Sequence, residues 1–304
     1  MLPTSLLRLV EDYLADCRAR GLSPKTIKDA YAYPLRDVLL PWCERIGIIE
    51  VTGLDARALN RLTSELLERG GRRGPLSRYT IDTYVRNINL FLGWCRREGL
   101  LDGTVRAQAP KLPRRVLDVL SAHELDRLED VARSERDKLI VRLLADTGMR
   151  AGELLQLREA DLVDQGRDRF LRLRGKGAKE RLVPVQPQLY RRLQRLDRAR
   201  PSDARGDTIF ISLTRRPGGA FQPLTISGLD QLIRGLGERA GLQKRVYPHL
   251  LRHSFATRML NRGMDPITLS RILGHSSLVM IQRTYAHQSA GDLSEALMRA
   301  LAAD

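Results

Sequence analysis

Tyr247-Pro-His-Leu-Leu-Arg-His253 opens the part of this 304-residue chain that decides its fold and its chemistry. Leu273-Gly-His-Ser-Ser277 and Arg283-Thr-Tyr-Ala-His287 follow it, and the three segments together hold four of the chain's five histidines. The proline of the first segment predicts the start of a helix, because proline is favoured in a first helical turn. Gly274 is predicted to end another helix in a left-handed conformation, which would hold the next residue at a sharp corner.

The histidines of this region allow more than one interpretation. His249 and Arg252 are three residues apart, so both side chains are expected to project from one face of the predicted helix. The arginine can clamp a phosphate while the histidine bonds that phosphate or exchanges a proton. His249 and His253 would alternatively bind zinc, although no acidic or cysteine ligand is near them in sequence. The plain alternatives are surface side chains at a helix start and, for His275, a histidine that stabilises the corner.

Arg150 adds a second arginine to this pattern. It lies in Asp146-Thr-Gly-Met-Arg-Ala-Gly-Glu153, where one helix is predicted to stop and another to begin. Free backbone amides at the start of a helix favour an anion, so an arginine there suits a phosphate. Glu153 follows one helical turn later, and it is predicted either to orient an arginine or histidine or to be a surface carboxylate.

A β-hairpin is predicted from residues 169–174 and 181–185, which flank Gly175-Lys-Gly-Ala-Lys179. Its glycine-rich turn would present Lys176 at the tip. A lysine there can reach a bound molecule and protonate a departing oxygen, or it can simply be solvated.

Cutting a phosphodiester while keeping its energy needs a nucleophile in line with phosphorus and cations on the non-bridging oxygens. It also needs a base for the nucleophile and an acid for the leaving oxygen. The sequence can supply all four without a metal or cofactor. Tyr285 is the candidate nucleophile, although a tyrosine with a pKa of about 10 needs neighbouring cations to favour its phenolate. A packed aromatic is the plain alternative, and only the neighbouring motifs distinguish Tyr285.

The charge of the chain points to a polyanionic partner. The formal net charge is +16, and only seven of the 52 basic residues are lysines. Arginine binds phosphate through a bidentate fork, so nucleic acid is the expected partner, with a solvated basic surface as the alternative.

Cysteine usage and hydropathy predict a cytoplasmic protein. Cys17, Cys43 and Cys95 show neither a disulfide framework nor zinc spacing, so they are expected to be reduced core thiols. No apolar run approaches the roughly 20 residues of a membrane span, and no signal-peptide pattern begins the chain.

The sequence predicts a mainly α-helical protein of the α+β type with two domains. Residues 1–104 are expected to form an all-helical domain, residues 105–118 a basic, proline-containing linker, and residues 119–304 a second domain with a small antiparallel sheet. A capping box at Ser121 begins that second domain, and residues 207–212 predict one further short strand. Helices are predicted over residues 5–20, 54–69, 225–238, 248–262, 266–273, 277–286 and 292–302, and from Ser23 and Ser77 onward.

In these motifs the chain resembles the tyrosine recombinase family, the phage-integrase and Xer type of site-specific recombinases. The resemblance rests on Thr147–Leu157, Gly175–Pro184, Pro248–Thr257 and Leu273–Ser277, which lead to Tyr285 in the family's order and spacing. It is strong over residues 115–290. It is weaker over the N-terminal helices, where Gly21-Leu-Ser-Pro-Lys-Thr26 fits the family's SAM-like core-binding domain. No separate arm-type module is expected before Met1, and the compact Xer-like or transposon-encoded plan is therefore the expected one.

The resemblance implies a clamp on one scissile phosphate of double-stranded DNA. Arg150 and Arg252 would hold that phosphate, His249 would act as general acid/base, and His275 would contact the phosphate. Four protomers, identical or paired with a related recombinase, would assemble as a tetramer on two recombination sites. The two domains of each protomer would grip the DNA from opposite sides.

The resemblance also implies the covalent steps. Lys176 would protonate the leaving 5′ oxygen, and Tyr285 would form a 3′-phosphotyrosyl link. The 5′-hydroxyl of a partner strand would then attack that link, giving a Holliday junction without a cofactor or ATP.

Two other functions remain alternatives at the level of sequence. One is a non-catalytic DNA-binding or accessory protein on the same scaffold. The other keeps the chemistry but acts like a type IB topoisomerase or a hairpin-forming resolvase. The apolar stripe of the last helix fits docking on a neighbouring protomer or on its own domain equally well.

Overall fold

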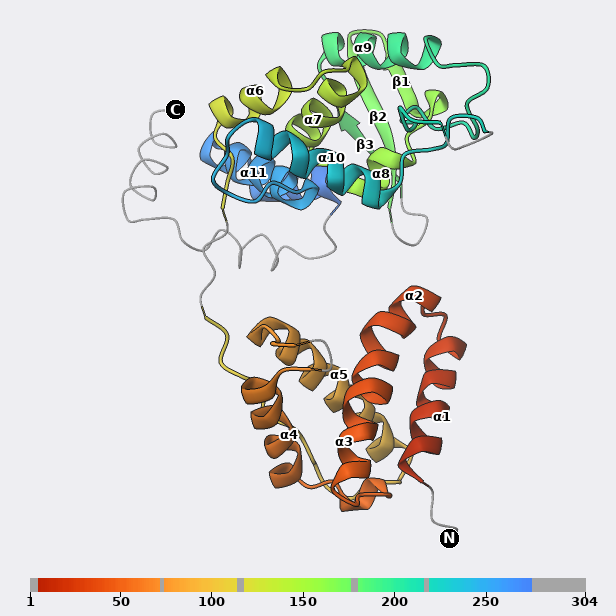
Figure 1. The fold of residues 1–304 in the computed structure, drawn as a ribbon. Coiled ribbons are helices and arrows are strands. Elements are labelled where there is room, and N and C mark those ends of the chain that lie inside the picture. Colours follow the sequence, from red (N-terminus) through yellow and green to blue (C-terminus); the bar gives the residue numbers. More distant parts are fainter. Residues whose placement is uncertain (1–4, 72–73, 114–117, 176–179, 216–218, 275–304) are drawn as a thin grey trace, which may run out of the picture. The chain divides into compact units, whose positions relative to one another are not determined.

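The computed structural model describes residues 5–71, 74–113, 118–175, 180–215 and 219–274 (Figure 1). The chain forms two compact units, Met1–Arg115 and Val116–Asp304, and the division falls inside the predicted linker. The described elements are helices apart from one three-stranded antiparallel sheet, which confirms the predicted fold class.

The first unit is all-helical in its described part, and its helices begin at capping side chains. The Ser23 and Ser77 hydroxyls accept hydrogen bonds from the backbone N–H groups of Thr26 and Thr80, as predicted. The three cysteines are buried in its core. The elements are α1 (Leu6–Ala19), α2 (Pro24–Thr26), η1 (Ile27–Leu39), α3 (Leu40–Arg45), η2 (Val51–Gly53), α4 (Ala56–Arg69) and α5 (Arg78–Arg97).

Helical structure continues from Pro24 to Arg45 through two prolines, Pro34 and Pro41. Pro41 is tolerated because it lies in the first turn of α3, where its missing N–H costs nothing. Pro34 lies inside η1, which has wider π-helical hydrogen bonding, a local adjustment that accommodates irregular positions.

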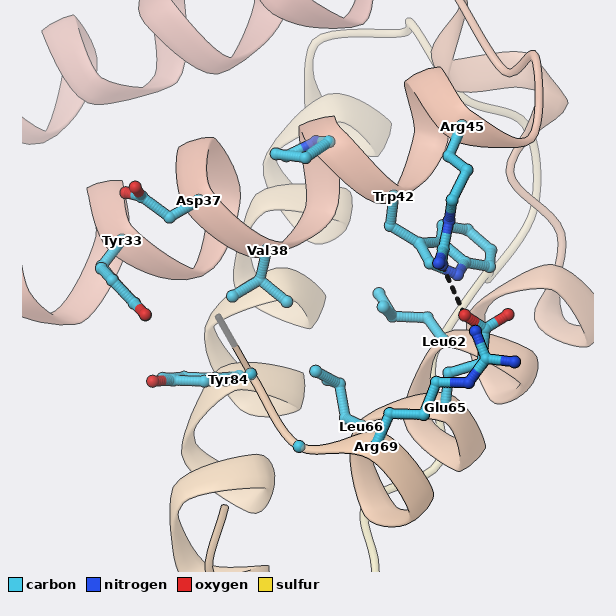
Figure 2. Close-up of a pocket in the computed structure, with 13 residues that line it drawn as sticks. Tyr33, Asp37, Val38, Trp42, Arg45, Leu62, Glu65, Leu66, Arg69 and Tyr84 are labelled. Atoms are coloured by element: carbon cyan, nitrogen blue, oxygen red, sulfur yellow. Dashed lines mark hydrogen bonds and ion pairs between the residues drawn. The ribbon is translucent and has the colours of Figure 1, made fainter. Parts of the chain in front are cut away.

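A cavity of about 330 Å³ lies beside this continuous helix in the first unit, and Figure 2 shows the side chains around it. Leu62, Leu66 and Val38 line it, and the Arg45–Glu65 ion pair lies at one side. It contains none of the residues for which the sequence predicts chemistry.

Part of the predicted linker packs onto the first unit. The Asn89 amide forms two hydrogen bonds with the backbone of Ala107, and the Asn60 side chain accepts the N–H of Gln108. Ala107 is buried. Residues 105–108 therefore follow the surface of α4 and α5 because side-chain amides satisfy their backbone groups, as a neighbouring strand would.

The second unit is built around α7, which contacts α6, α8, α9 and α11. The sheet has the order β1-β2-β3, and Leu171 of β2 lies opposite Leu162 and Val183. The elements are α6 (Ala122–Asp130), α7 (Glu135–Thr147), α8 (Ala151–Leu155), η3 (Glu159–Asp161), β1 (Leu162–Gln165), β2 (Asp168–Arg174), β3 (Glu180–Pro184), α9 (Pro187–Arg198), α10 (Ile226–Arg239), α11 (Pro248–Asn261) and α12 (Pro266–Leu273).

Several local predictions are confirmed in this unit. Ser121 and Glu124 form the predicted capping box at the start of α6. The hairpin pairs β2 with β3, and α10, α11 and α12 lie within two residues of the predicted ranges. The predicted strand over residues 207–212 forms only isolated bridges, from Thr208 to Arg158 and from Ile211 to Pro223. A ladder cannot extend through Pro223, since proline has no N–H to donate.

Among the described residues, no helix combines the length and the apolar character needed to cross a membrane.

Gly148 is the residue that ends α7 and turns the chain toward Arg150. Its φ is 60°, a left-handed conformation that favours glycine. A Cβ atom there would lie 2.4 Å from Cδ1 of Phe255 and 2.7 Å from Cδ2 of Leu273. Glycine is therefore required twice, by the backbone conformation and by the packing of α11 and α12 against the turn.

We expect Gly148→Ala to lower the free energy of unfolding by about 3 kcal/mol or more, since it combines backbone strain with overpacking. Gly166→Ala is the matched control. Its φ is 70°, but an added Cβ atom would meet nothing within 4 Å, so only about 1 kcal/mol of backbone strain is expected. Urea unfolding of the two variants tests this. Equal losses of stability would contradict the packing argument.

Candidate active site

Four of the seven residues that the sequence assigns to the site lie in the described part of the chain, and all four belong to the second unit. They are Arg150, Glu153, His249 and Arg252. The other three, Lys176, His275 and Tyr285, lie outside the described residues.

Arg252 is the most deeply buried of the cations. It comes from the second turn of α11, and only 3% of its surface is exposed. Its Nη1 donates to the carbonyl of Gly148 at 2.6 Å, and its Nη2 donates to the carbonyl of Leu273 at 2.8 Å. These two bonds join the end of α7 to the end of α12 and fix the plane of the guanidinium.

Arg150 lies immediately before α8 and is more exposed. Its Nη2 donates to the carbonyl of Gly274 at 2.9 Å, and its Nη1 donates to Oε1 of Glu153 at 2.8 Å. The backbone N–H of Arg150 also donates to Oε2 of Glu153. Glu153 therefore bonds both the backbone and the side chain of Arg150, and it is buried, so it is not a surface carboxylate.

Arg181 is a member of this cluster that the sequence analysis did not single out. It comes from β3, and its Nη1 and Nη2 donate to the two oxygens of Glu153 at 2.7 and 2.8 Å. Its Nε donates to the carbonyl of Ile272 at 2.7 Å. One signal was present in the sequence. Arg181 lies two residues before Val183, which is buried, so both side chains are on the same face of β3. An arginine that faces the protein interior needs an anion as its partner.

Three arginines from three elements thus meet three consecutive carbonyls at the end of α12. Arg181, Arg252 and Arg150 bind the carbonyls of Ile272, Leu273 and Gly274, respectively. The last carbonyls of a helix have no partner within it, and the helix dipole places negative charge there. The helix end therefore attracts and orients the cations just before His275.

His249 lies on α11 three residues before Arg252. Partial burial and then the positive charges of Arg252 and Arg150 lower its pKa below 6.5. The imidazole is therefore mainly neutral at pH 7 in the protein alone, and an anion bound beside it would raise its pKa. A histidine of this kind can accept or donate one proton near neutral pH.

Burial also lowers the pKa of His253, followed by the charge of His249. The described residues contain no group of three or more histidine, cysteine, aspartate or glutamate side chains that could hold a metal ion. The zinc alternative for His249 and His253 gains no third ligand in that part of the chain.

The cluster has the chemistry of an anion clamp. Arg150 and Arg252 bind neighbouring carbonyls of one helix end, and His249 lies within the field of both. Guanidinium groups held in fixed planes bind the oxygens of a phosphate with little loss of side-chain freedom. The buried Glu153 and the partly buried Arg181 hold this arrangement in place.

A family model described as the phage integrase family matches residues 118–291. Tyrosine recombinase XerD of Staphylococcus haemolyticus (strain JCSC1435) is 31% identical over 294 residues, which cover 92% of this chain and 94% of that protein. Tyrosine recombinase XerA of Pyrococcus furiosus is 35% identical over 224 residues, which cover 71% of this chain and 74% of that protein.

A solved structure of XerH site-specific recombinase bound to difH substrate, in a pre-cleavage complex, is similar to this chain with a TM-score of 0.68. The sequence identity is 24%, and the match covers 97% of this chain and 84% of that one. At this identity the likeness concerns the fold.

We expect Glu153→Gln to lower the free energy of unfolding by about 3 kcal/mol at pH 7, because it leaves two guanidinium groups without their shared buried anion. Although burial opposes its ionisation, the hydrogen bonds from Arg181 and Arg150 and the charge of Arg181 lower the pKa of Glu153 below 4.5. The contribution of ionised Glu153 to the free energy of unfolding is therefore complete above about pH 4.5. It is lost as the pH falls through the pKa of Glu153 in the native protein.

Denaturation as a function of pH checks both statements. The difference between wild type and Glu153→Gln should shrink in acid. Glu238→Gln is the control, since Glu238 is an exposed partner of Arg234 and its loss should change stability by less than about 0.5 kcal/mol. A gap between wild type and Glu153→Gln that stays constant from pH 7 to pH 3 would contradict this, because it would mean that folding does not change the pKa of Glu153.

Proposed function

The chain belongs to the phage integrase family and is a site-specific tyrosine recombinase, and we propose that it exchanges DNA strands through a 3′-phosphotyrosyl intermediate and a Holliday junction. The observation that supports this mechanism best is the pair of arginines at the end of α12. Arg150 and Arg252 are fixed by adjacent carbonyls, beside a histidine whose pKa they help to lower. A single phosphate between them would receive two guanidinium groups and one proton-transfer group.

In the proposed cleavage step, the phenolic oxygen of Tyr285 attacks the scissile phosphorus and loses its proton, with His249 as the general base. A bond forms between phosphorus and the tyrosine oxygen, and the bond from phosphorus to the 5′ oxygen breaks. Lys176 gives a proton to that leaving oxygen. Arg150 and Arg252, with His275, stabilise the negative charge that builds on the phosphate in the transition state.

In the proposed joining step, the 5′-hydroxyl of a partner strand attacks the phosphotyrosyl phosphorus and releases Tyr285. One phosphoester replaces another in each step, so the energy of the DNA backbone is retained and neither a cofactor nor ATP takes part.

We further propose that residues 1–104 are the core-binding domain, residues 105–118 the linker and residues 119–304 the catalytic domain. A homo-tetramer, or a heterotetramer with a related recombinase, would hold two recombination sites, since strand exchange needs two duplexes that are each cut on both strands. The net charge of +16 suits a partner as strongly anionic as DNA. DNA as the substrate also makes the cytoplasm the expected location.

Covalent capture tests the nucleophile. The protein is incubated with a library of nicked duplexes carrying a randomised central region, and adducts that survive denaturant are sequenced to identify the site. Wild type should form such an adduct, and Tyr285→Phe should form none while it still binds the recovered site, because only the hydroxyl is removed. Wild type that binds but never becomes linked would support the accessory function instead. Equal adduct from Tyr285→Phe would refute this nucleophile.

A modified leaving group tests Lys176. We expect Lys176→Ala to slow cleavage of the recovered site by about 100-fold or more, the usual range for loss of a general acid. A duplex with a 5′-phosphorothiolate at the scissile position should restore the rate, because a thiolate leaves without a proton. Lys138→Ala, on α7, is the control. Slow cleavage of both substrates by Lys176→Ala would exclude the general-acid role.

A further inference from the structure

We propose that Arg181 is a positioning residue of the active site, which acts on the phosphate-binding Arg150 through Glu153 and on the end of α12 through the carbonyl of Ile272. This inference rests on the proposed function and extends it by a residue that carries no role in that mechanism. It assigns to β3 the task of holding the phosphate clamp in its binding geometry.

The contacts of Arg181 use its guanidinium along two edges. Nη1 and Nη2 form the bidentate pair with Glu153, and Nε reaches the carbonyl of Ile272. The side chain is 14% exposed and Glu153 is 3% exposed, so this pair is shielded from water. A lysine offers no planar fork of this kind and would hold at most part of the arrangement.

The charge balance of the cluster depends on Arg181. Glu153 Oε1 accepts from both Arg150 and Arg181, so one carboxylate is shared by two guanidinium groups. With Arg181 in place, this trio keeps a net charge of +1 for an incoming phosphate. Without Arg181, Glu153 and Arg150 would form a closed neutral pair, and the carboxylate would compete with the phosphate for Arg150.

Gly274 provides independent evidence that the end of α12 accommodates the side chain of Arg181. Its φ is 63°, and a Cβ atom there would lie 2.9 Å from Nη1 of Arg181 and 3.0 Å from its Cζ. The absent side chain of Gly274 thus leaves the space that the guanidinium occupies. Two features therefore fix the turn at Gly274, namely its left-handed backbone conformation and the guanidinium of Arg181 packed against it.

The experiment compares Arg181→Met with Arg192→Met. Arg192 is the matched control, since it is a partly buried arginine of the same unit, and within the described residues its hydrogen bonds go to Glu129 and Glu135. Two quantities are measured: the rate of covalent adduct formation on the nicked site recovered by covalent capture, and the affinity of the DNA-free protein for inorganic phosphate, followed by the His249 ring resonances.

Arg181→Met should slow adduct formation by about 10- to 100-fold, because the clamp is misplaced and partly neutralised. It should also weaken phosphate binding by about 10-fold, because the Glu153 carboxylate then competes with the phosphate for Arg150. Arg192→Met should change each quantity by less than about 3-fold, as expected for a distant site. Arg181→Lys should keep most of the phosphate affinity but lose part of the rate, since it retains the charge and not the fork.

The double variant Glu153→Gln/Arg181→Met separates positioning from simple stability. Removing both partners of a buried pair avoids an uncompensated charge and frees Arg150 from its carboxylate, so phosphate affinity should recover toward wild type. Equal effects of Arg181→Met and Arg192→Met, or a double variant no better than Arg181→Met, would overturn the proposal. Wild type that forms no adduct would refute the proposed function, and the phosphate affinities would still decide the role of Arg181.

Discussion

The carbonyl end of α12 is the constraint on which the rest of the site depends. A helix must leave its last carbonyl groups without partners inside the helix, and here three consecutive ones receive arginines from three other elements. The arginines satisfy the carbonyls, and the carbonyls fix the arginines. Binding of a phosphate therefore costs little side-chain conformational entropy, since the guanidinium groups are already held in fixed planes.

Small residues make this convergence possible. Gly148 turns the chain between α7 and α8, two residues before Arg150, and the carbonyl of Gly148 accepts a hydrogen bond from Arg252. Gly274 ends α12 and leaves room for Arg181. Beneath them, one buried carboxylate, Glu153, links β3 to the start of α8. The charges at the surface are thus supported by ion pairs within the domain, which keeps a strongly basic site compatible with a stable fold.

Local signals made much of the fold predictable from the sequence. Serine caps, the capping box at Ser121 and the pairing of β2 with β3 depend on residues a few positions apart, and the structure has them. The continuous helix through Pro34 and the isolated bridges of residues 207–212 were not predicted, because tertiary packing decided them. The site divides in the same way. His249 with Arg252, and Arg150 with Glu153, are each one helical turn apart, whereas Arg181 meets Glu153 across 28 residues and Ile272 across 91. Contacts of that range leave no local pattern.

A crystal structure of the protein on its recovered DNA site, with Tyr285→Phe preventing cleavage, would test the proposed phosphate clamp. The proposed mechanism predicts one scissile phosphate with the guanidinium groups of Arg150 and Arg252 and the ring of His249 within about 3 Å of its oxygens. It also predicts that Arg181 remains on Glu153 and on the carbonyl of Ile272. A scissile phosphate held elsewhere, or one bound with Arg181 displaced from Glu153, would contradict it.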